Sequence, residues 1–202
     1  IKSVEEESTS SARAHMSVYG LTYEDYRRIA ESFKDVQKAA PVKLVRKESR
    51  LGEKLLELRV VGTTPVWFEL VPREIIAGRV LTELDVDNQA PAAVLTEYGA
   101  RRLLAGEHTI GQTIRIGSNS FLVIGIVKSE SGQAGNIQIP DLEVDAYIPI
   151  EVARKYFGDI QTRMTAGSRE REQVELHQII LRIDSTEHVE PTAEAVEQML
   201  NN

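Results

Sequence analysis

The amino-acid sequence predicts an α+β fold, in which helices and strands are mixed along one chain. Hydrophobic residues make up 42% of the 202 residues, which is enough to fill a core. Apolar side chains recur with a helical period in some segments and form short strand-like runs in others. The apolar runs stay far below the roughly 20 residues that cross a bilayer. We therefore expect the chain itself to be soluble.

The first predicted helix spans Thr22 to Ala40. Thr22 can cap it, because Asp25 lies three residues later in the capping-box position and the apolar residues that follow share one face. Pro41 is predicted to end this helix, since proline lacks the N–H that an internal helical residue donates. Two strand-like runs follow, at 42–47 and 55–61, and they predict a hairpin.

A sharp corner is predicted at 62–65, where the sequence is Gly-Thr-Thr-Pro. Trp67 and Phe68 then supply a large apolar anchor for the chain. A later acidic stretch contains Glu83, Asp85 and Asp87, and it lacks the spacing of a Ca²⁺ loop. We expect instead that Arg79 pairs with Asp85 across a turn.

The middle of the chain predicts a strand-helix unit followed by a hairpin. Residues 92–95 form a short apolar strand, which enters a helix through Thr96, and Gly106 is expected to stop that helix. Two Ile- and Val-rich strands are predicted at 113–116 and 121–127. The Gly-Ser-Asn sequence between them suits a tight turn.

Two segments lack periodicity, Lys128 to Glu143 and Asp159 to Gln173. Both are predicted to be loops without regular structure. The first is expected to be long and exposed, and long loops are often functional. Between the two segments we expect a strand at 144–148, ended by Pro149, and a short helix at 151–157.

The last part of the chain predicts a strand at Leu176–Ile183 and a helix at Val189–Leu200, with Pro191 in its first turn. This strand has no partner nearby in the sequence. We therefore predict that it joins the hairpin of residues 42–61 in one sheet, with the first and last helices covering it.

Composition excludes several kinds of function. The formal net charge of −7 and the pI near 5.3 argue against nucleic acid or an anionic bilayer as the main partner, because both require clustered Lys and Arg. The chain has no cysteine, so disulfides, thiolate metal sites and cysteine nucleophiles are excluded.

Motifs of catalysis are not found either. The four histidines are isolated and lack the spacing of helical zinc pairs. The sequence contains no nucleophile elbow, no P-loop and no complete dinucleotide-binding glycine pattern. We therefore expect no catalytic residues, no cofactor and no metal.

Four segments carry a resemblance to a known family. They read VVGTTPVWFEL at 60–70, AGRVLTELD at 77–85, AAVLTEYGARRLL at 92–104 and IGQTIRIGSNSFLVIGIV at 110–127. In this order they resemble the periplasmic core domain of MacB-like ABC transporter permeases, and the resemblance extends from about Leu21 to Leu200. The residues that match the family's pattern, with structural roles, are Gly62, Thr63, Pro65, Gly78, Arg79, Asp85, Gly111, Gly125 and Pro149.

The resemblance implies two subdomains. A membrane-proximal (porter-like) mixed α/β layer would be built from residues 1–70 and 158–202, and a smaller (sabre-like) α/β subdomain would be inserted between them at 71–157. Membrane helices would flank this extracytoplasmic region, and we expect the chain, which begins at Ile1 without a leader, to be a fragment.

The resemblance also implies partners and a mode of action. A cytoplasmic ATPase would drive the membrane helices, and the domain would move against a second permease copy, a periplasmic adaptor or the exported substrate. The candidate contact residues in the two aperiodic segments are Lys128, Gly132, Gly135, Asp141, Arg163 and Arg169.

Two other classes of function stay open on the sequence. A sensor that binds a peptide or small molecule without transport would need an apolar groove with a few polar groups, and residues 128–143 could rim one. A hydrolase would need an activated nucleophile and a base. An adjacent ATPase gene would favour transport, whereas an adjacent kinase gene alone would favour sensing.

Overall fold

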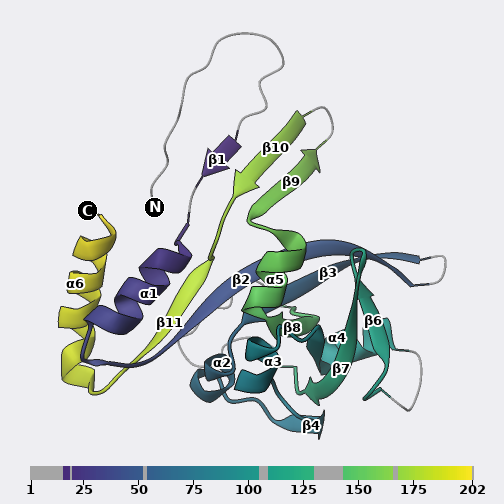
Figure 1. Ribbon diagram of the computed structural model, residues 1–202, viewed down its shortest axis with the longest axis horizontal. Helices are drawn as coiled ribbons and strands as arrows, with labels where there is room; N and C mark the ends of the chain where they lie inside the picture. Colours follow the sequence, from purple (N-terminus) through teal and green to yellow (C-terminus); the bar gives the residue numbers. More distant parts are fainter. Residues whose placement is uncertain are drawn as a thin grey trace.

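The computed structural model describes residues 16–18, 20–51, 54–104, 109–129, 143–165 and 168–201. Figure 1 shows their arrangement. The strands are β1 (Met16–Val18), β2 (Val36–Leu51), β3 (Lys54–Thr63), β4 (Ile75–Gly78), β5 (Ala92–Thr96), β6 (Thr113–Ile116), β7 (Asn119–Val127), β8 (Ala146–Pro149), β9 (Ile160–Thr165), β10 (Ser168–Gln173) and β11 (Gln178–Ile183). The helices are α1 (Tyr23–Ser32), α2 (Val66–Leu70), α3 (Glu83–Asp87), α4 (Glu97–Leu103), α5 (Ile150–Phe157), the 3₁₀ turn η1 (Thr186–His188) and α6 (Val189–Leu200).

The main sheet has eight strands in the order β11-β2-β3-β8-β5-β7-β4, with β6 also paired to β7. Strand β2 is long enough to serve two partners. Its first part, up to Val42, pairs antiparallel with β11, and its second part, from Lys43 onward, pairs antiparallel with β3. Strand β2 therefore links the α1, α6 and β11 side of the molecule to the remainder of the sheet (Figure 1).

Apolar side chains cover the two faces of this sheet as two separate clusters. Val60 and Ile148 belong to one cluster, whereas their chain neighbours Val61 and Tyr147 belong to the other. This alternation follows from the two-residue period of a strand. The second cluster contains Trp67, whose ring centroid lies 4.4 Å from that of Tyr147. The aromatic anchor expected after the corner at 62–65 is thus part of the core.

Several predicted elements are confirmed. Thr22 caps α1 in a capping box with Asp25. Thr96 ends β5 and caps α4 through its side chain. The strand predicted at Leu176–Ile183 begins two residues later and pairs with β2 of the predicted hairpin. Helix α1 packs against β2, and α6 lies beside β11.

The predicted length of the first helix is wrong. Helix α1 ends at Ser32, and β2 already begins at Val36. Residues 37–40 are Gln-Lys-Ala-Ala, which favour helix, but pairing with β11 overrides this preference. Pro41 lies inside the strand, opposite Ile179 of β11, and the pairing with β3 starts only at Lys43. A residue without an N–H is tolerated where one side of the strand has no ladder.

The prediction that residues 159–173 lack regular structure is also wrong. Strands β9 and β10 form an antiparallel hairpin there, and β1 adds to β10 in parallel. The sequences IQTRMT and SREREQ contain almost no apolar alternation, so pattern analysis missed them. Backbone pairing needs no such alternation.

The division into two subdomains stays a prediction. Strands from 1–70, 71–157 and 158–202 all contribute to the main sheet, and the parallel β3–β8 pair joins the first of these segments to the second. In the part of the chain that the structure describes, no helix is long and apolar enough to cross a membrane.

Candidate functional site

A three-stranded sheet made of β1, β10 and β9 projects from the molecule, away from the main sheet (Figure 1). We call this sheet the arm. Two of the predicted contact residues lie on it, Arg163 in β9 and Arg169 in β10, and Arg163 is the register partner of Glu170.

A buried lysine anchors the base of the arm. The side chain of Lys43, in β2, is 1% exposed, and its ammonium group lies 2.7 Å from the Asp159 carboxylate. The same group donates to the carbonyl oxygens of Val174, at 3.0 Å, and Glu175, at 3.1 Å. These three acceptors match the three donors of an ammonium group, so the buried charge is satisfied.

The anchor holds both ends of the β9–β10 hairpin. Asp159 precedes β9, and Val174 follows β10 directly. Their backbones are also bonded to each other, since the Val174 N–H donates to the Asp159 carbonyl at 2.9 Å. Lys43 therefore ties the two strands of the arm to the centre of β2.

Helix α1 and helix α5 close around this anchor. The Tyr23 hydroxyl lies 3.5 Å from Asp159, and the Tyr23 N–H donates to the Glu175 carboxylate at 2.9 Å. The Arg154 guanidinium lies over the Tyr23 ring, 4.4 Å from its centroid. Burial raises the pKa of Tyr23, and the neighbouring Asp159 carboxylate adds to this. The phenol is therefore neutral at physiological pH.

The chain on either side of the anchor is fixed by two further contacts. Leu21 and Leu176 form a two-way backbone bridge, at 3.1 and 2.9 Å. The His177 N–H donates to the Val42 carbonyl at 2.8 Å, and His177 Nδ1 accepts from the Leu44 N–H at 3.0 Å. That imidazole is thus the neutral tautomer protonated on Nε2.

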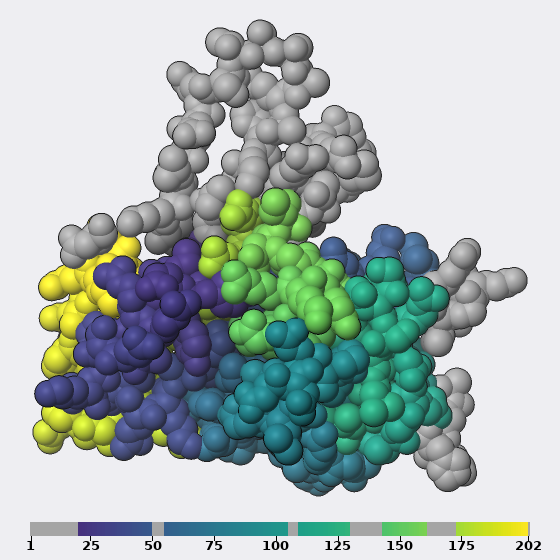
Figure 2. All heavy atoms as spheres, viewed as in Figure 1, coloured from purple at the N-terminus to yellow at the C-terminus, as the bar shows by residue number. Residues whose placement is uncertain are grey.

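Figure 2 shows the residues of α5 at the surface between α1 and the β6–β7 hairpin.

Sequence analysis did not identify Lys43, Asp159 or Tyr23. One signal was available, a single lysine inside the apolar sequence Val-Lys-Leu-Val. A half-buried strand commonly places its polar residues toward solvent, so this pattern does not reveal a buried lysine. A buried ion pair between β2 and a residue 116 positions later has no sequence signature.

The corner at 62–65 is a packing feature. A Cβ atom on Gly62 would lie 2.6 Å from the Cβ of Ala153 in α5, so only glycine allows this approach. The hydroxyl of the fully buried Thr63 donates to the Pro41 carbonyl at 2.8 Å. Pro65 directly precedes α2.

The Gly78–Asp85 segment combines a close backbone approach with an ion pair. Gly78 of β4 is the register partner of Gly125 of β7, and a Cβ on Gly125 would lie 1.9 Å from the Arg79 carbonyl oxygen. Arg79 donates to both carboxylate oxygens of Asp85, at 2.6 and 2.9 Å. Asp85 also accepts from the backbone and hydroxyl of Thr82, each at 2.8 Å. The predicted Arg79–Asp85 pair is confirmed.

The other predicted positions do not converge on one site. Gly111 has a φ of +85°, and Pro149 directly precedes α5. Lys128 forms an exposed ion pair with Glu74 at 2.8 Å, beside β4, which lies opposite the arm in Figure 1. Gly132, Gly135 and Asp141 lie outside the described residues. Lys128 and the arm are therefore separate surfaces.

An apolar groove of about 510 Å³ lies between β11 and α6. Ile179, Leu181 and Ile183 line one wall, and α6 residues that include Val196 and Leu200 line the other. Its lining contains none of the described residues of the 128–143 segment, which was expected to rim a ligand site.

Residues 2–199 match the family model described as MacB-like periplasmic core domain. The chain is similar to the Macrolide export ATP-binding/permease protein MacB of Syntrophobacter fumaroxidans, with 30% identity over 127 residues. This match covers 62% of the chain and 18% of the relative, so the chain spans less than one fifth of that protein.

Two solved structures share the fold. The periplasmic region of MacB from Actinobacillus actinomycetemcomitans aligns with a TM-score of 0.67 at 21% identity, over 90% of this chain and 73% of that one. The extracellular domain of the noncanonic ABC-type transporter YknZ from Gram-positive bacteria aligns with a TM-score of 0.68 at 15% identity, over 90% and 82%.

Proposed function

Since the chain belongs to the family of MacB-like periplasmic core domains, we propose that it is the extracytoplasmic part of an ABC transporter permease that couples cytoplasmic ATP hydrolysis to export. In this proposal the domain itself performs no catalysis. An ATPase on the cytoplasmic side supplies the energy, and the domain moves against a second copy, an adaptor or the substrate.

The observation that carries the proposal is the anchored arm. A sheet that projects from the core can reach a partner, and a buried ion pair at its base can transmit movement of β2 to it. Lys43 sits where β2 changes from β11 to β3 as its partner, so a shift between the two sides of the sheet acts directly on this anchor. Rigid elements joined by such contacts are the physical means of coupling.

The test is to remove the anchor in the full-length transporter. Lys43→Met keeps an unbranched side chain that is one atom shorter and removes its charge. We expect ATP hydrolysis in membranes to persist, while export of a macrolide, the class for which the relatives are named, falls by about fivefold or more, which corresponds to a coupling free energy of about 1 kcal/mol.

Lys34→Met is the matched control, because it removes the charge of an exposed lysine that lies outside the arm, its anchor and the predicted contact residues. It should leave both rates unchanged. Thermal unfolding of both variants checks that the domain still folds. If Lys43→Met folds and exports as well as wild type, the arm is not the coupling element.

A second candidate function is ligand sensing without transport. The groove between β11 and α6 favours it, because its volume and apolar walls suit a small molecule, with Thr192, Glu197 and Asn201 as polar groups. Filling the groove with Val196→Trp should abolish a sensing output and leave export intact. An adjacent kinase gene without an ATPase gene would favour this candidate.

A further inference from the structure

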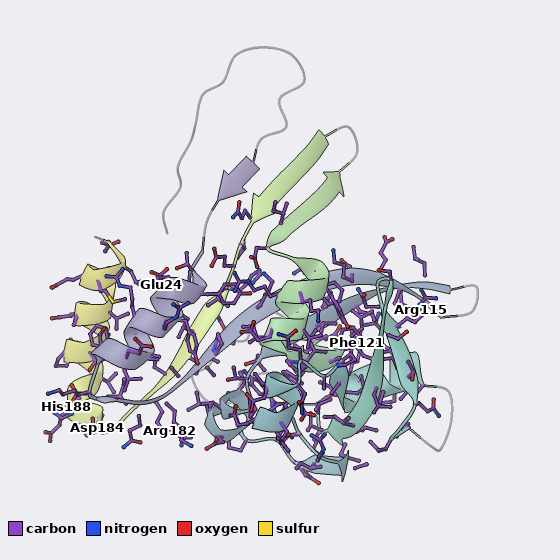
Figure 3. The ribbon with its side chains drawn as sticks, in the orientation of Figure 1. Glu24, Arg115, Phe121, Arg182, Asp184 and His188 are labelled. Carbon is purple, nitrogen blue, oxygen red and sulfur yellow. The ribbon has the colours of Figure 1, made fainter. Side chains whose placement is uncertain are left out.

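Three metal-ligating side chains from distant parts of the sequence meet at the start of α6. Asp35 directly precedes β2, Asp184 directly follows β11, and His188 is the last residue of η1. Figure 3 shows Asp184 and His188 together at this end of α6. From the sequence we expected no metal, because the histidines are isolated. The fold brings Asp35 to the other two residues from about 150 positions away.

The backbone holds the two carboxylates side by side. Val36 and Ile183 are register partners at the end of the β2–β11 ladder, and the Asp184 N–H donates to the Asp35 carbonyl at 3.0 Å. His188 is held next to them by η1, whose last turn is closed by a bond from the His188 N–H to the Ser185 carbonyl at 3.2 Å. The three side chains are therefore brought together by the fold and not by chance contact of long flexible side chains.

The possible ligand atoms of the three residues lie close together. One nitrogen or oxygen atom from each residue lies within 4.8 Å of those of the other two. His188 Nδ1 is 2.8 Å from the Asp184 carboxylate and 3.8 Å from the Asp35 carboxylate. In a tetrahedral zinc site with bonds of about 2.1 Å, the ligand atoms are about 3.4 Å apart. Small movements of these half-exposed side chains would bring the three ligand atoms to this spacing.

The charges also suit a cation. Over the described ranges, His188 is the basic side chain within ion-pair distance of either carboxylate, and no Lys or Arg neutralises them. A proton on Nδ1 can be shared closely with one carboxylate, which leaves the other at 3.8 Å. A divalent ion would neutralise both carboxylates and use the imidazole as a third ligand.

We propose that Asp35, Asp184 and His188 bind one divalent transition-metal ion of the Zn²⁺ class, with water completing the coordination. An imidazole together with two carboxylates favours Zn²⁺ over Mg²⁺ and Ca²⁺, which prefer oxygen ligands alone. The bound ion would clip the first turn of α6 to the edge of the sheet. In this turn Val189 is 48% exposed, and the apolar groove lies between the helix and β11.

The test is calorimetric titration of Zn²⁺ into the metal-free 202-residue chain at pH 7.5. We expect one ion per chain, and we expect His188→Ala and Asp35→Asn each to weaken binding by at least about tenfold. Asp87→Asn, which neutralises an exposed aspartate on α3, is the matched control and should bind as wild type. Mg²⁺ and Ca²⁺ should bind far more weakly than Zn²⁺.

Thermal unfolding gives a second readout. The melting temperature of the wild-type chain should rise with Zn²⁺ concentration, and that of His188→Ala should not, because only an ion bound to the folded state stabilises it. Absence of Zn²⁺ binding by the folded wild-type chain would overturn the proposal and leave a hydrogen-bonded His-Asp cluster. Binding that survives both ligand substitutions would also overturn it, since the ion would then occupy other residues.

Discussion

The ion pair between Arg79 and Asp85 permits a quantitative prediction about stability. Asp85 is 8% exposed, and it accepts two hydrogen bonds from Arg79 and two from Thr82. The Arg79 guanidinium is the largest influence on this carboxyl and lowers its pKa from 3.8 to about 2. With 1.36 kcal/mol for each pKa unit, the ionised carboxylate contributes about 2 kcal/mol to folding.

The perturbation is Asp85→Asn, which keeps the shape of the side chain and an oxygen that can still accept from Thr82. Urea unfolding at pH 7 and 25 °C should show a loss of about 2 kcal/mol with an unchanged m-value. Asp87→Asn on the same short helix is exposed and should change stability by less than about 0.5 kcal/mol.

The direction of the pKa shift determines how the contribution of Asp85 to the free energy of unfolding changes with pH. Because the folded pKa of Asp85 is below the unfolded one, its contribution is complete above about pH 4 and is lost as the pH falls toward about 2. The difference between wild type and Asp85→Asn should therefore be constant from pH 7 to pH 5 and should shrink below pH 4. A difference that stays constant down to pH 2, or that is below about 0.5 kcal/mol at pH 7, would refute the reasoning.

Substitutions at three further positions have expected outcomes. Gly125→Ala should destabilise the domain by about 1–3 kcal/mol in urea unfolding, because the new Cβ would overlap the Arg79 carbonyl, and a neutral result would show that the β4–β7 contact is not tight. Thr63→Val should cost about 1–2 kcal/mol, since it removes the donor to the buried Pro41 carbonyl, and Thr63→Ser should recover part of the loss. Lys128→Met should change the melting temperature by less than about 2 °C, because its ion pair is exposed, and a larger loss would mean that this surface is structural.

The sequence predicted the elements that combine a capping residue with an apolar period. Thr22 and Thr96 cap helices as expected, and the β6–β7 hairpin forms around the expected turn. The pairing of β11 with β2 was also predictable, because an apolar strand without a local partner must pair with a distant one. The caps and the hairpin depend on short stretches of sequence. The β11–β2 pairing follows because no strand near β11 in the sequence is available as its partner.

The arm and its anchor were not predictable in the same way. Strands β9 and β10 consist largely of charged and polar residues, so they carry no apolar alternation. The strand character of residues 36–40 depends on β11, which is more than 130 positions away. Lys43 could be recognised as buried only after the fold had placed Asp159 and two carbonyl oxygens around it. In each case a tertiary contact, and not local preference, decides the outcome.

The most direct test of the account is whether the arm touches a partner in the intact transporter. The chain contains no native cysteine, so a single cysteine introduced into it gives an unambiguous crosslinking position within this domain. Arg169→Cys places it on β10 of the arm, and Ser118→Cys places it at the exposed turn between β6 and β7 as a control. Each variant is expressed in membranes as the proposed full-length permease, together with the ATPase and adaptor that the proposal names, and is treated with a short bifunctional thiol- and amine-reactive reagent.

The account predicts that Arg169→Cys forms a crosslink to the second permease copy or the adaptor, with a yield that changes between ATP-bound and nucleotide-free states, and that Ser118→Cys does not. If transport is intact and Arg169→Cys gives no crosslink in either state, while Ser118→Cys does, the working surface lies on the β6–β7 side and the arm is not the contact element.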